Sequence, residues 1–416
     1  TGSDSTLSAN WPAFTETVSG IAKYEIAIGT SSGGTDVVDW TSNGTDTSLT
    51  KTSLSLSSGT AYYISVKATD NAGNESTTIT SDGVTVDTAG PIAGTVFDGP
   101  GADMDWTNSD STLSANWKDF SDSLSGINIY EYAIGTEIDS FALVNWTSSG
   151  ADTFFVESDL TMISSEIYYV FVKATDLVSN TGNISASDGI MVDLIVPLVG
   201  ELYDGSESED MDWQSSDSTF ALYWSGSDSR ELDHYQYSVG TAPGDSNIVA
   251  WTSASTNTSV VLENVELLEE QTYYGNVRAV DKASNVSDVV SSDGITIDYS
   301  APVSGSVTDG LVADLIFTGT ADSLSANWSG FSDSISGISN YEYAIGTILG
   351  ATNVVAWTNN QLATSFIRED LTLQGGTTYY ISVRATDLVE NTSAVATSNG
   401  ITVQQFIPTN TEPFDG

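Results

Sequence analysis

Cysteine is absent from the sequence, and basic residues are scarce. The first absence excludes disulfide bonds, thiolate metal sites and cysteine nucleophiles. The second leaves 10 Lys and Arg against 56 Asp and Glu, so the formal net charge is −46. A surface this acidic repels nucleic acids and anionic membranes and attracts cations. We therefore expect no nucleic-acid partner.

Histidine occurs only once, at His234. A Ser-His-Asp triad could therefore form at no more than one place in the chain. No phosphate-binding glycine loop and no basic patch is present. Paired carboxylates are so abundant that no glycosidase pair stands out from the background. We expect no catalytic site, and we interpret His234 as a solvated residue in a loop or at the start of a strand.

Long apolar runs are missing as well. No stretch reaches the roughly 18 consecutive apolar residues that a membrane-spanning helix needs, and no stretch resembles a signal peptide. No segment shows a capped helical period of apolar residues either. We expect no direct membrane span, and any signals for export or anchoring would lie outside this chain.

The sequence contains four copies of one repeat. A tryptophan after Ser-Ala-Asn or its equivalent, the first residue of a Tyr-Tyr pair and a proline all recur at a spacing of about 105 residues. The three sets are Trp11, Trp117, Trp224 and Trp328; Tyr62, Tyr168, Tyr273 and Tyr379; and Pro91, Pro197, Pro302 and Pro408. Because independent landmarks share this period, each repeat is predicted to form a small domain.

The prolines mark the boundaries of the predicted repeats. These repeats cover residues 1–90, 91–196, 197–301 and 302–407, and 408–416 begins a fifth. The first repeat lacks its opening strand, because Thr1 aligns with Thr107. The chain is then either a segment of a longer array, with further repeats as its neighbours, or a unit that assembles head to tail. In the second case the tail of one chain supplies the missing strand of the next.

Within a repeat the pattern is that of β-strands. In the fourth repeat Tyr379, Ile381, Val383 and Ala385 occupy every second position, so one face of this strand turns toward a core and the other toward water. Clusters of Gly, Asn, Asp and Ser separate such short runs. The sequence therefore predicts an all-β chain.

Three motifs of the fourth repeat resemble the fibronectin type III domain and its bacterial relatives. Trp328 stands where that family has the core tryptophan of its second strand, and residues 337–343 resemble the third strand. The run that ends at Tyr379 resembles the corner between the fifth and sixth strands, where a tyrosine hydroxyl bonds to upstream backbone. The resemblance extends to all repeats. It implies four tandem Ig-like or fibronectin type III-like antiparallel β-sandwiches in an elongated array.

The sequences of the repeats also resemble those of repeats in large secreted adhesins and secreted enzymes of gliding and marine bacteria. The motifs that show this resemblance are Tyr-Glu-Tyr-Ala-Ile-Gly-Thr and the following Val-Val-Ala-Trp-Thr. This resemblance implies an extracellular, cell-surface protein with surface glycans or proteins as partners. Three functions stay open: a non-catalytic stalk or adhesin segment that spaces or displays binding sites for cell–surface or cell–cell attachment, an accessory region of a secreted polysaccharide-degrading enzyme, and a subunit of a self-assembling extracellular filament.

Calcium is the one cofactor for which the sequence offers a site. In the fibronectin-like fold, two loops share the pole at which the preceding linker enters, and all three segments carry Asp or Asn. The expected groups are Asp87, Asp122, Asp176 and Asn180; Asp193, Asp228, Asp281 and Asn285; and Asp298, Asp333, Asp387 and Asn391. Calcium prefers six to eight oxygen ligands and would stiffen the junction. The alternative is that these residues only shape their turns.

A second acidic loop is expected near the opposite pole. Asp98, Asp103 and Asp105 precede Trp106, and the third repeat has Asp204, Asp210 and Asp212 before Trp213. The fourth repeat keeps only Asp309 and Asp314. We interpret this segment as a turn followed by a packed tryptophan.

Recurring aromatic residues form the last candidate site. The expected strip consists of Trp40 and Tyr63, Trp146 and Tyr169, Trp251 and Tyr274, and Trp357 and Tyr380. Outward-facing rings of this kind could stack on sugars. The alternative is that they cover the sheet as part of the packing, which every repeat would need equally.

Overall fold

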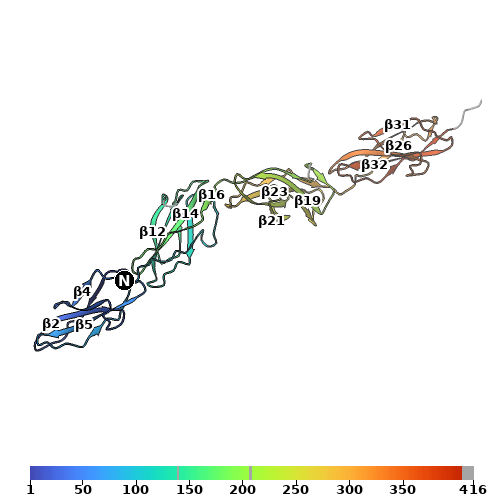
Figure 1. Cartoon of the computed structure of the whole chain (residues 1–416). Helices are drawn as coiled ribbons and strands as arrows, with labels where there is room; N and C mark the ends of the chain where they lie inside the picture. The colour runs from blue at the N-terminus through green and yellow to red at the C-terminus, as the bar shows by residue number, and fades with distance from the viewer. Residues whose placement is uncertain (138–139, 206–208, 405–416) are drawn as a thin grey trace, which may run out of the picture. The chain divides into compact units, whose positions relative to one another are not determined.

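Every regular element of the computed structural model is a β-strand (Figure 1). The structure describes residues 1–137, 140–205 and 209–404, and none of these residues lies in a helix. It follows that none of them belongs to a helix long and apolar enough to cross a bilayer. The expected all-β class is confirmed, whereas the expected start of a fifth repeat at 408–416 lies outside the described residues.

Contacts within the chain define two units, Thr1–Ile195 and Val196–Gly416. The strands of the first unit are β1 (Leu7–Asn10), β2 (Ile21–Gly29), β3 (Val38–Ser42), β4 (Ser48–Lys51), β5 (Ala61–Asp70), β6 (Ile79–Thr80), β7 (Val84–Thr85), β8 (Thr95–Asp98), β9 (Trp106–Thr107), β10 (Leu113–Lys118), β11 (Ile127–Gly135), β12 (Val144–Gly150), β13 (Phe154–Glu157), β14 (Ile167–Asp176), β15 (Ser185–Ala186) and β16 (Ile190–Val192).

The second unit continues the same order of elements. Its strands are β17 (Leu198–Asp204), β18 (Trp213–Gln214), β19 (Thr219–Ser227), β20 (Leu232–Gly240), β21 (Val249–Ser255), β22 (Ser259–Glu263), β23 (Thr272–Asp281), β24 (Val290–Ser291), β25 (Ile295–Ile297), β26 (Ser306–Asp309), β27 (Phe317–Thr318), β28 (Leu324–Ser329), β29 (Ile338–Gly346), β30 (Val355–Asn359), β31 (Ser365–Arg368), β32 (Thr378–Asp387), β33 (Ala396–Thr397) and β34 (Ile401–Val403).

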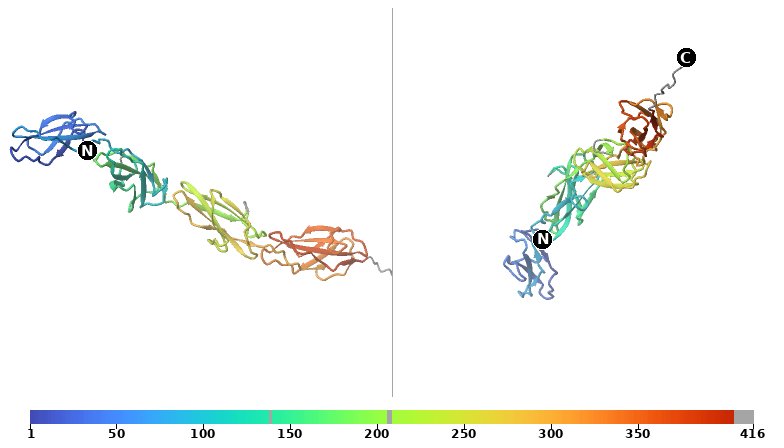
Figure 2. Two further views of the ribbon diagram at one scale, coloured as in Figure 1. Left: turned by 90° about the horizontal axis from the view of Figure 1, so that it is seen from below. Right: turned by 90° about the vertical axis from the view of Figure 1, so that its right-hand side faces the viewer.

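The second repeat shows the topology most fully. One sheet has the order β13-β10-β8, and the other has the order β12-β11-β14-β16-β9, with β15 also paired to β14. All pairs are antiparallel except β9 with β16, which runs parallel. The third and fourth repeats have the same two sheets (Figure 2). In the first repeat β1 pairs with β4, and no strand corresponding to β8 is present among its residues.

Each repeat has its own hydrophobic core between its two sheets. In the second repeat Leu113 and Trp117 of β10 pack with Tyr132 of β11 and Val170 of β14. The rings of Trp117 and Tyr130 meet edge to face, with centroids 5.7 Å apart. Separate clusters of the same kind occupy the other three repeats. Burial of alternate residues on both sheets is what holds such a sandwich together.

The tyrosine corner predicted from the sequence is present in all four repeats. The hydroxyl oxygen of Tyr168 accepts a hydrogen bond of 3.0 Å from the backbone N–H of Ile163, five residues upstream. Equivalent bonds join Tyr62 to Ser57, Tyr273 to Leu268 and Tyr379 to Gln374. These contacts fix the connection that crosses from one sheet to the other.

His234 lies near the start of β20, as the sequence indicated. Its Nδ1 is 2.7 Å from the Oδ2 of Asp233, the residue before it in the chain. Asp233 is exposed, and His234 is half-buried.

Candidate metal centres at the domain junctions

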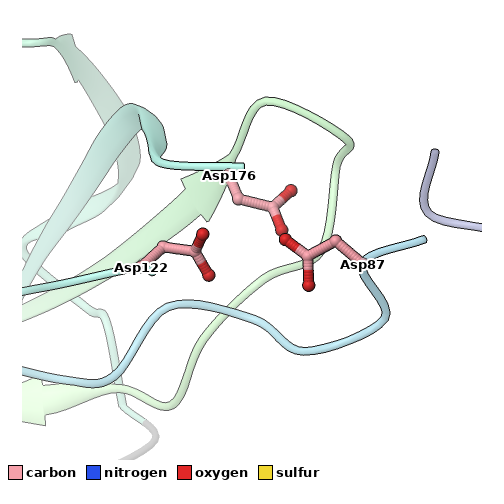
Figure 3. Close-up of side chains that lie close together, drawn as sticks. All are labelled: Asp87, Asp122 and Asp176. Atoms are coloured by element: carbon pink, nitrogen blue, oxygen red, sulfur yellow. The ribbon is translucent and has the colours of Figure 1, made fainter. Parts of the chain in front are cut away.

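Three carboxylates converge where the linker from the first repeat enters the second. Asp87 follows β7, Asp122 lies between β10 and β11, and Asp176 ends β14 (Figure 3). Each offers one oxygen, and these oxygens lie within 4.8 Å of one another. Asp87 is 2 % exposed and Asp176 is fully buried. The structure thus brings together the three acidic residues that the sequence assigned to this junction.

The Asp122 loop is held in shape by its own aspartate. One oxygen of Asp122, Oδ1, accepts the backbone N–H groups of Leu124, Ser125 and Gly126 at 3.1, 2.8 and 2.7 Å. This is the turn-forming role of aspartate that the sequence left as an alternative. It uses one oxygen, so the turn and a metal contact are compatible at this residue.

Asp176 is held in place by the loop that follows β14. Its Oδ1 accepts the N–H groups of Val178 and Asn180 at 2.9 and 2.8 Å. Burial raises the pKa of Asp176, but the hydrogen bonds from Asn180 and Val178 outweigh burial, so the pKa lies below its usual value. The group is therefore a carboxylate anion at neutral pH.

The amide nitrogen of Asn180 fastens the linker to the loop. Its Nδ2 donates hydrogen bonds to Asp176 Oδ2 at 2.7 Å and to the linker carbonyls of Asp87 and Ala89 at 2.9 and 3.3 Å. Asn180 therefore ties the linker to the loop through Nδ2, and a ligand role of its amide oxygen stays a prediction. Its position at the junction is as expected.

The linker aspartate contributes a nearly buried charge to the group. Asp87 accepts the N–H of Ala89 at Oδ1, 3.1 Å away, and the N–H of Ser125 at Oδ2, 3.2 Å away. In the described part of the chain no Lys or Arg forms an ion pair with Asp87, Asp122 or Asp176. Three carboxylates this close repel one another unless a cation or a proton intervenes.

The junction between the third and fourth repeats has the same construction. Asp298, Asp333 and Asp387 place one oxygen each within 4.8 Å of the others. Asp298 is fully buried, and its Oδ1 has no hydrogen-bond partner. Asn391 repeats the linker contacts through Nδ2, to the carbonyls of Asp298 and Ser300, both at 3.1 Å. Two junctions therefore share one arrangement.

One difference separates the two junctions. Burial raises the pKa of Asp387 above its usual value despite the hydrogen bonds from Asn391 and Val389, and the charge of Asp298 adds to the rise. In the first junction the same hydrogen bonds outweigh burial at Asp176. The protein alone therefore stabilises the anion of Asp387 less well than that of Asp176.

The predicted group around Asp193 draws on both units. Asp193 belongs to the first unit, whereas Asp228, Asp281 and Asn285 belong to the second. A site that requires both units stays a prediction. Within the second unit, Asn285 donates through its backbone N–H to Asp281 Oδ1 at 2.7 Å, as Asn180 does to Asp176.

The aromatic residues lie half-buried, each on the sheet of its own repeat that corresponds to the sheet of β11 and β14, and each has a packing partner. Lys173 lies over the ring of Trp146, 4.3 Å from its centroid, and Lys67, Arg278 and Arg384 contact Trp40, Trp251 and Trp357 at 5.0, 4.4 and 4.5 Å. The ring of Tyr169 covers Gly189, where an added Cβ would lie 2.7 Å from Cε1. Tyr63, Tyr274 and Tyr380 cover Gly83, Gly294 and Gly400 in the same way. Packing thus explains the strip, and sugar binding by it stays a prediction.

Sequence reasoning missed two acidic residues that join the second acidic loop. Asp188 lies beside Asp98 and Asp103, and Asp293 lies beside Asp204 and Asp210. The available signal was the recurring Ser-Asp-Gly before the last strand, at 187–189 and 292–294. Its fourth copy reads Ser-Asn-Gly, at 398–400.

A scan against protein-family models finds no match, and neither does a search of curated proteins. Among solved structures, the chain is similar to the FN1-FN3 domains of chicken CNTN1 (15% identity, 76% of this chain and 100% of that one, TM-score 0.30). It is also similar to domains A168-A170 of titin, with 16% identity over 76% of this chain and 100% of that one and a TM-score of 0.33. The fibronectin(III)-like modules of Clostridium thermocellum CbhA match with 13% identity over 49% of this chain and 94% of that one and a TM-score of 0.30. TM-scores this low leave the assignment to the strand order and the tyrosine corner. By those features the repeats are tandem fibronectin type III-like β-sandwiches.

Proposed function

We propose that the chain is a non-catalytic segment of an extracellular stalk, which spaces or displays binding sites for attachment of a cell to a surface or to another cell. Calcium ions at the junctions would hold consecutive domains in fixed orientations. The observation that carries the proposal is the recurrence of one carboxylate arrangement at the linkers that contain Asp87 and Asp298.

The chemistry of the junction favours a hard divalent cation. Calcium takes oxygen ligands from carboxylates, backbone carbonyls and water. Asp298 supplies a buried oxygen without a partner, and Asp87 and Asp176 are nearly or fully buried. A cation there would offset the mutual repulsion of the carboxylates. Because one ligand comes from the linker and two from loops of the following domain, the bound ion would restrict the linker.

The repetition itself favours a spacer over a single strong binding site. Repeated domains give reach, and many weak sites along one chain give avidity without any deep pocket. The acidic surface suits cation-rich surroundings, and the partners would be surface glycans or proteins. A stalk role needs no reaction centre.

Distance measurements between two spin labels test the spacer role. The chain has no cysteine, so Ser55→Cys and Thr153→Cys introduce the only two thiols, at exposed positions on either side of the first junction. We expect calcium to narrow the distribution of label distances and a chelator to broaden it. In Asp122→Asn, the amide oxygen can still accept the turn hydrogen bonds, but the charge is gone, so the calcium effect should be lost.

Asp82→Asn is the matched control for this measurement. Asp82 is exposed in the first repeat and is not among the junction carboxylates, so its loss removes one charge and no ligand. Calcium should narrow the distribution in this variant as in the parent chain. A distribution that is equally broad with calcium and with chelator would rule out the stiffened stalk. Incubation of the whole chain with immobilised glycans then tests the display of binding sites.

A further inference from the structure

The second and third domains each hold another group of carboxylates, where the loop after the first strand meets the loop before the last strand. In the second domain Asp98 ends β8, Asp103 lies in the following loop, and Asp188 lies in the loop between β15 and β16. Their oxygens lie within 4.8 Å of one another. In the third domain Asp204, Asp210 and Asp293 form the equivalent group with the same limit. None of these residues takes part in the junctions.

The central aspartate of each group is buried and incompletely hydrogen-bonded. Asp98 and Asp204 have no exposed surface. Asp98 Oδ2 accepts the N–H of Gly189 at 3.1 Å, but its Oδ1 has no partner. Both oxygens of Asp204 lack a partner, so the oxygen that faces Asp210 and Asp293 is unpartnered. A buried polar atom without a partner is costly, and a bound water or ion is one way to satisfy it.

The fold positions these residues through the short parallel pairing. Met191 pairs with Trp106 between β16 and β9, and the N–H of Met191 donates to the carbonyl of Asp105 at 2.8 Å. This pairing sets the loop before Trp106 beside the loop that carries Asp188. The N–H of Asp98 donates to Asp103 Oδ1 at 2.9 Å, so the first two carboxylates are held together before any ligand arrives.

In the fourth domain a neutral side chain stands in place of the third carboxylate. Asp309 and Asp314 correspond to Asp98 and Asp103, but Asn399 stands in place of Asp188. The Nδ2 of Asn399 donates a hydrogen bond of 2.7 Å to Asp314 Oδ2. There the pair of carboxylates meets a neutral donor from the same chain. The second and third domains instead place a third negative charge at the same point.

We propose that Asp98, Asp103 and Asp188, and likewise Asp204, Asp210 and Asp293, each bind a hard divalent cation, with calcium as the expected ion. The buried carboxylate supplies the anchoring oxygen, the two exposed carboxylates close the site, and water completes the coordination. The bound cation would join the loop after β8 to the loop before β16. The fourth domain is expected to have no such ion.

A proton is the other means of neutralising these groups. Burial raises the pKa of Asp98 and of Asp204 to about 7. Neighbouring serine and glycine residues lower each pKa in part, and the charges of the nearby aspartates raise it further. A cation lowers such a pKa by favouring the anion. The geometry of three carboxylates, and not this shift, distinguishes the second and third domains from the fourth.

The proposal is tested by counting the calcium ions bound per chain. Equilibrium dialysis of the whole protein with radioactive calcium gives this number, at a free calcium concentration of about 1 mM, which is in the range of the dissociation constants of extracellular calcium-binding modules. Asp188→Asn with Asp293→Asn copies the fourth domain, so it should fold and bind two fewer ions. Asn399→Asp should bind one more. Asp82→Asn is the control for charge, because Asp82 occupies the Ser-Asp-Gly position of the first domain, where the partner loop is missing.

The outcomes separate this site from the junction sites. Asp122→Asn should remove one junction ion and leave the ions at these sites, so each class of site succeeds or fails by itself. An unchanged count in both Asp188→Asn with Asp293→Asn and Asn399→Asp would overturn the proposal. A loss in Asp82→Asn as large per residue would also overturn it, because it would assign the ions to the general negative field. Unchanged far-ultraviolet circular dichroism confirms that each variant is folded.

Discussion

Tyr379 and Gln374 are joined by a hydrogen bond of 2.8 Å, in which the tyrosine hydroxyl oxygen accepts the backbone N–H. Tyr379 is 3 % exposed, so water cannot replace the bond without local opening. Tyr379→Phe should destabilise the fourth domain by about 1–2 kcal/mol, because it leaves the Gln374 N–H without its partner. Hydrogen exchange measured on peptides of β32 gives the change.

Tyr380→Phe provides the comparison for this prediction. Tyr380 is the next residue, is half-buried, and makes no hydroxyl hydrogen bond within the described residues. Its replacement should change exchange in β32 much less. Equal effects of the two substitutions would show that the corner hydrogen bond does not contribute to stability.

A second prediction concerns Arg384, which lies between Trp357 and Glu342. The guanidinium carbon is 4.5 Å from the Trp357 ring centroid, and the Nη2 is 2.8 Å from Glu342 Oε2. A double-mutant cycle with Arg384→Gln and Trp357→Leu should give a coupling free energy of about 0.5–1 kcal/mol. The same cycle on Lys67 and Trp40, which are 5.0 Å apart, should give a smaller value. A coupling of zero in both cycles would mean that the rings are held by apolar packing alone.

The sequence was sufficient for features that one strand or one turn determines. Alternation in the strand of Tyr379 predicted its buried face, and the resemblance to the fibronectin type III domain predicted the corner. The convergence of Asp87, Asp122 and Asp176 followed from knowing which loops share a pole in this fold. In these cases local pattern and topology agree, so few alternatives remain.

Two features were beyond the sequence for physical reasons. An asparagine amide offers a donor and an acceptor, and only the positions of the linker carbonyls decide that Asn180 donates. Asp188 joins Asp98 through the parallel pairing of β9 with β16, two strands too short to show any alternation. Contacts between residues so distant in the chain depend on that pairing, which Ser-Asp-Gly alone does not reveal.

A pH dependence is expected from Asp309 of the fourth domain. Burial raises its pKa to about 6, against hydrogen bonds from Ser398 and Gly400, with a further rise from Asp314. A carboxyl with a higher pKa in the folded than in the unfolded chain binds more protons when folded. Its contribution therefore makes the domain more stable as the pH falls from about 7 toward the unfolded value of about 3.9.

Asp309→Asn should flatten this dependence. The amide keeps an oxygen that can accept the Gly400 N–H, and it carries no charge to bury. At pH 8 we expect the variant to be more stable by on the order of 1 kcal/mol, after allowance for solvent screening of the loop. Hydrogen exchange in β26 and β28, corrected for the intrinsic effect of pH, measures the difference. A variant whose stability keeps the parent's slope between pH 5 and pH 8 would show that another group titrates.

The last prediction separates the donor role of Asn180 from a ligand role. Asn180→Asp removes the amide protons that bond the carbonyls of Asp87 and Ala89, and it adds a carboxylate beside Asp176. With a chelator present, the variant should melt at a lower temperature than the parent, because the linker contacts are lost and like charges face each other. With calcium, the new carboxylate supplies a further oxygen, so the rise in melting temperature on adding calcium should exceed that of the parent chain.

Asn74→Asp is the matched comparison, because the Asn74 amide bonds Asp70 Oδ2 at 2.8 Å and no linker carbonyl among the described residues. It should lower the melting temperature without increasing the response to calcium. If Asn180→Asp responds to calcium no more than Asn74→Asp, then the junction carboxylates do not hold the ion, and Asn180 serves only to fasten the linker.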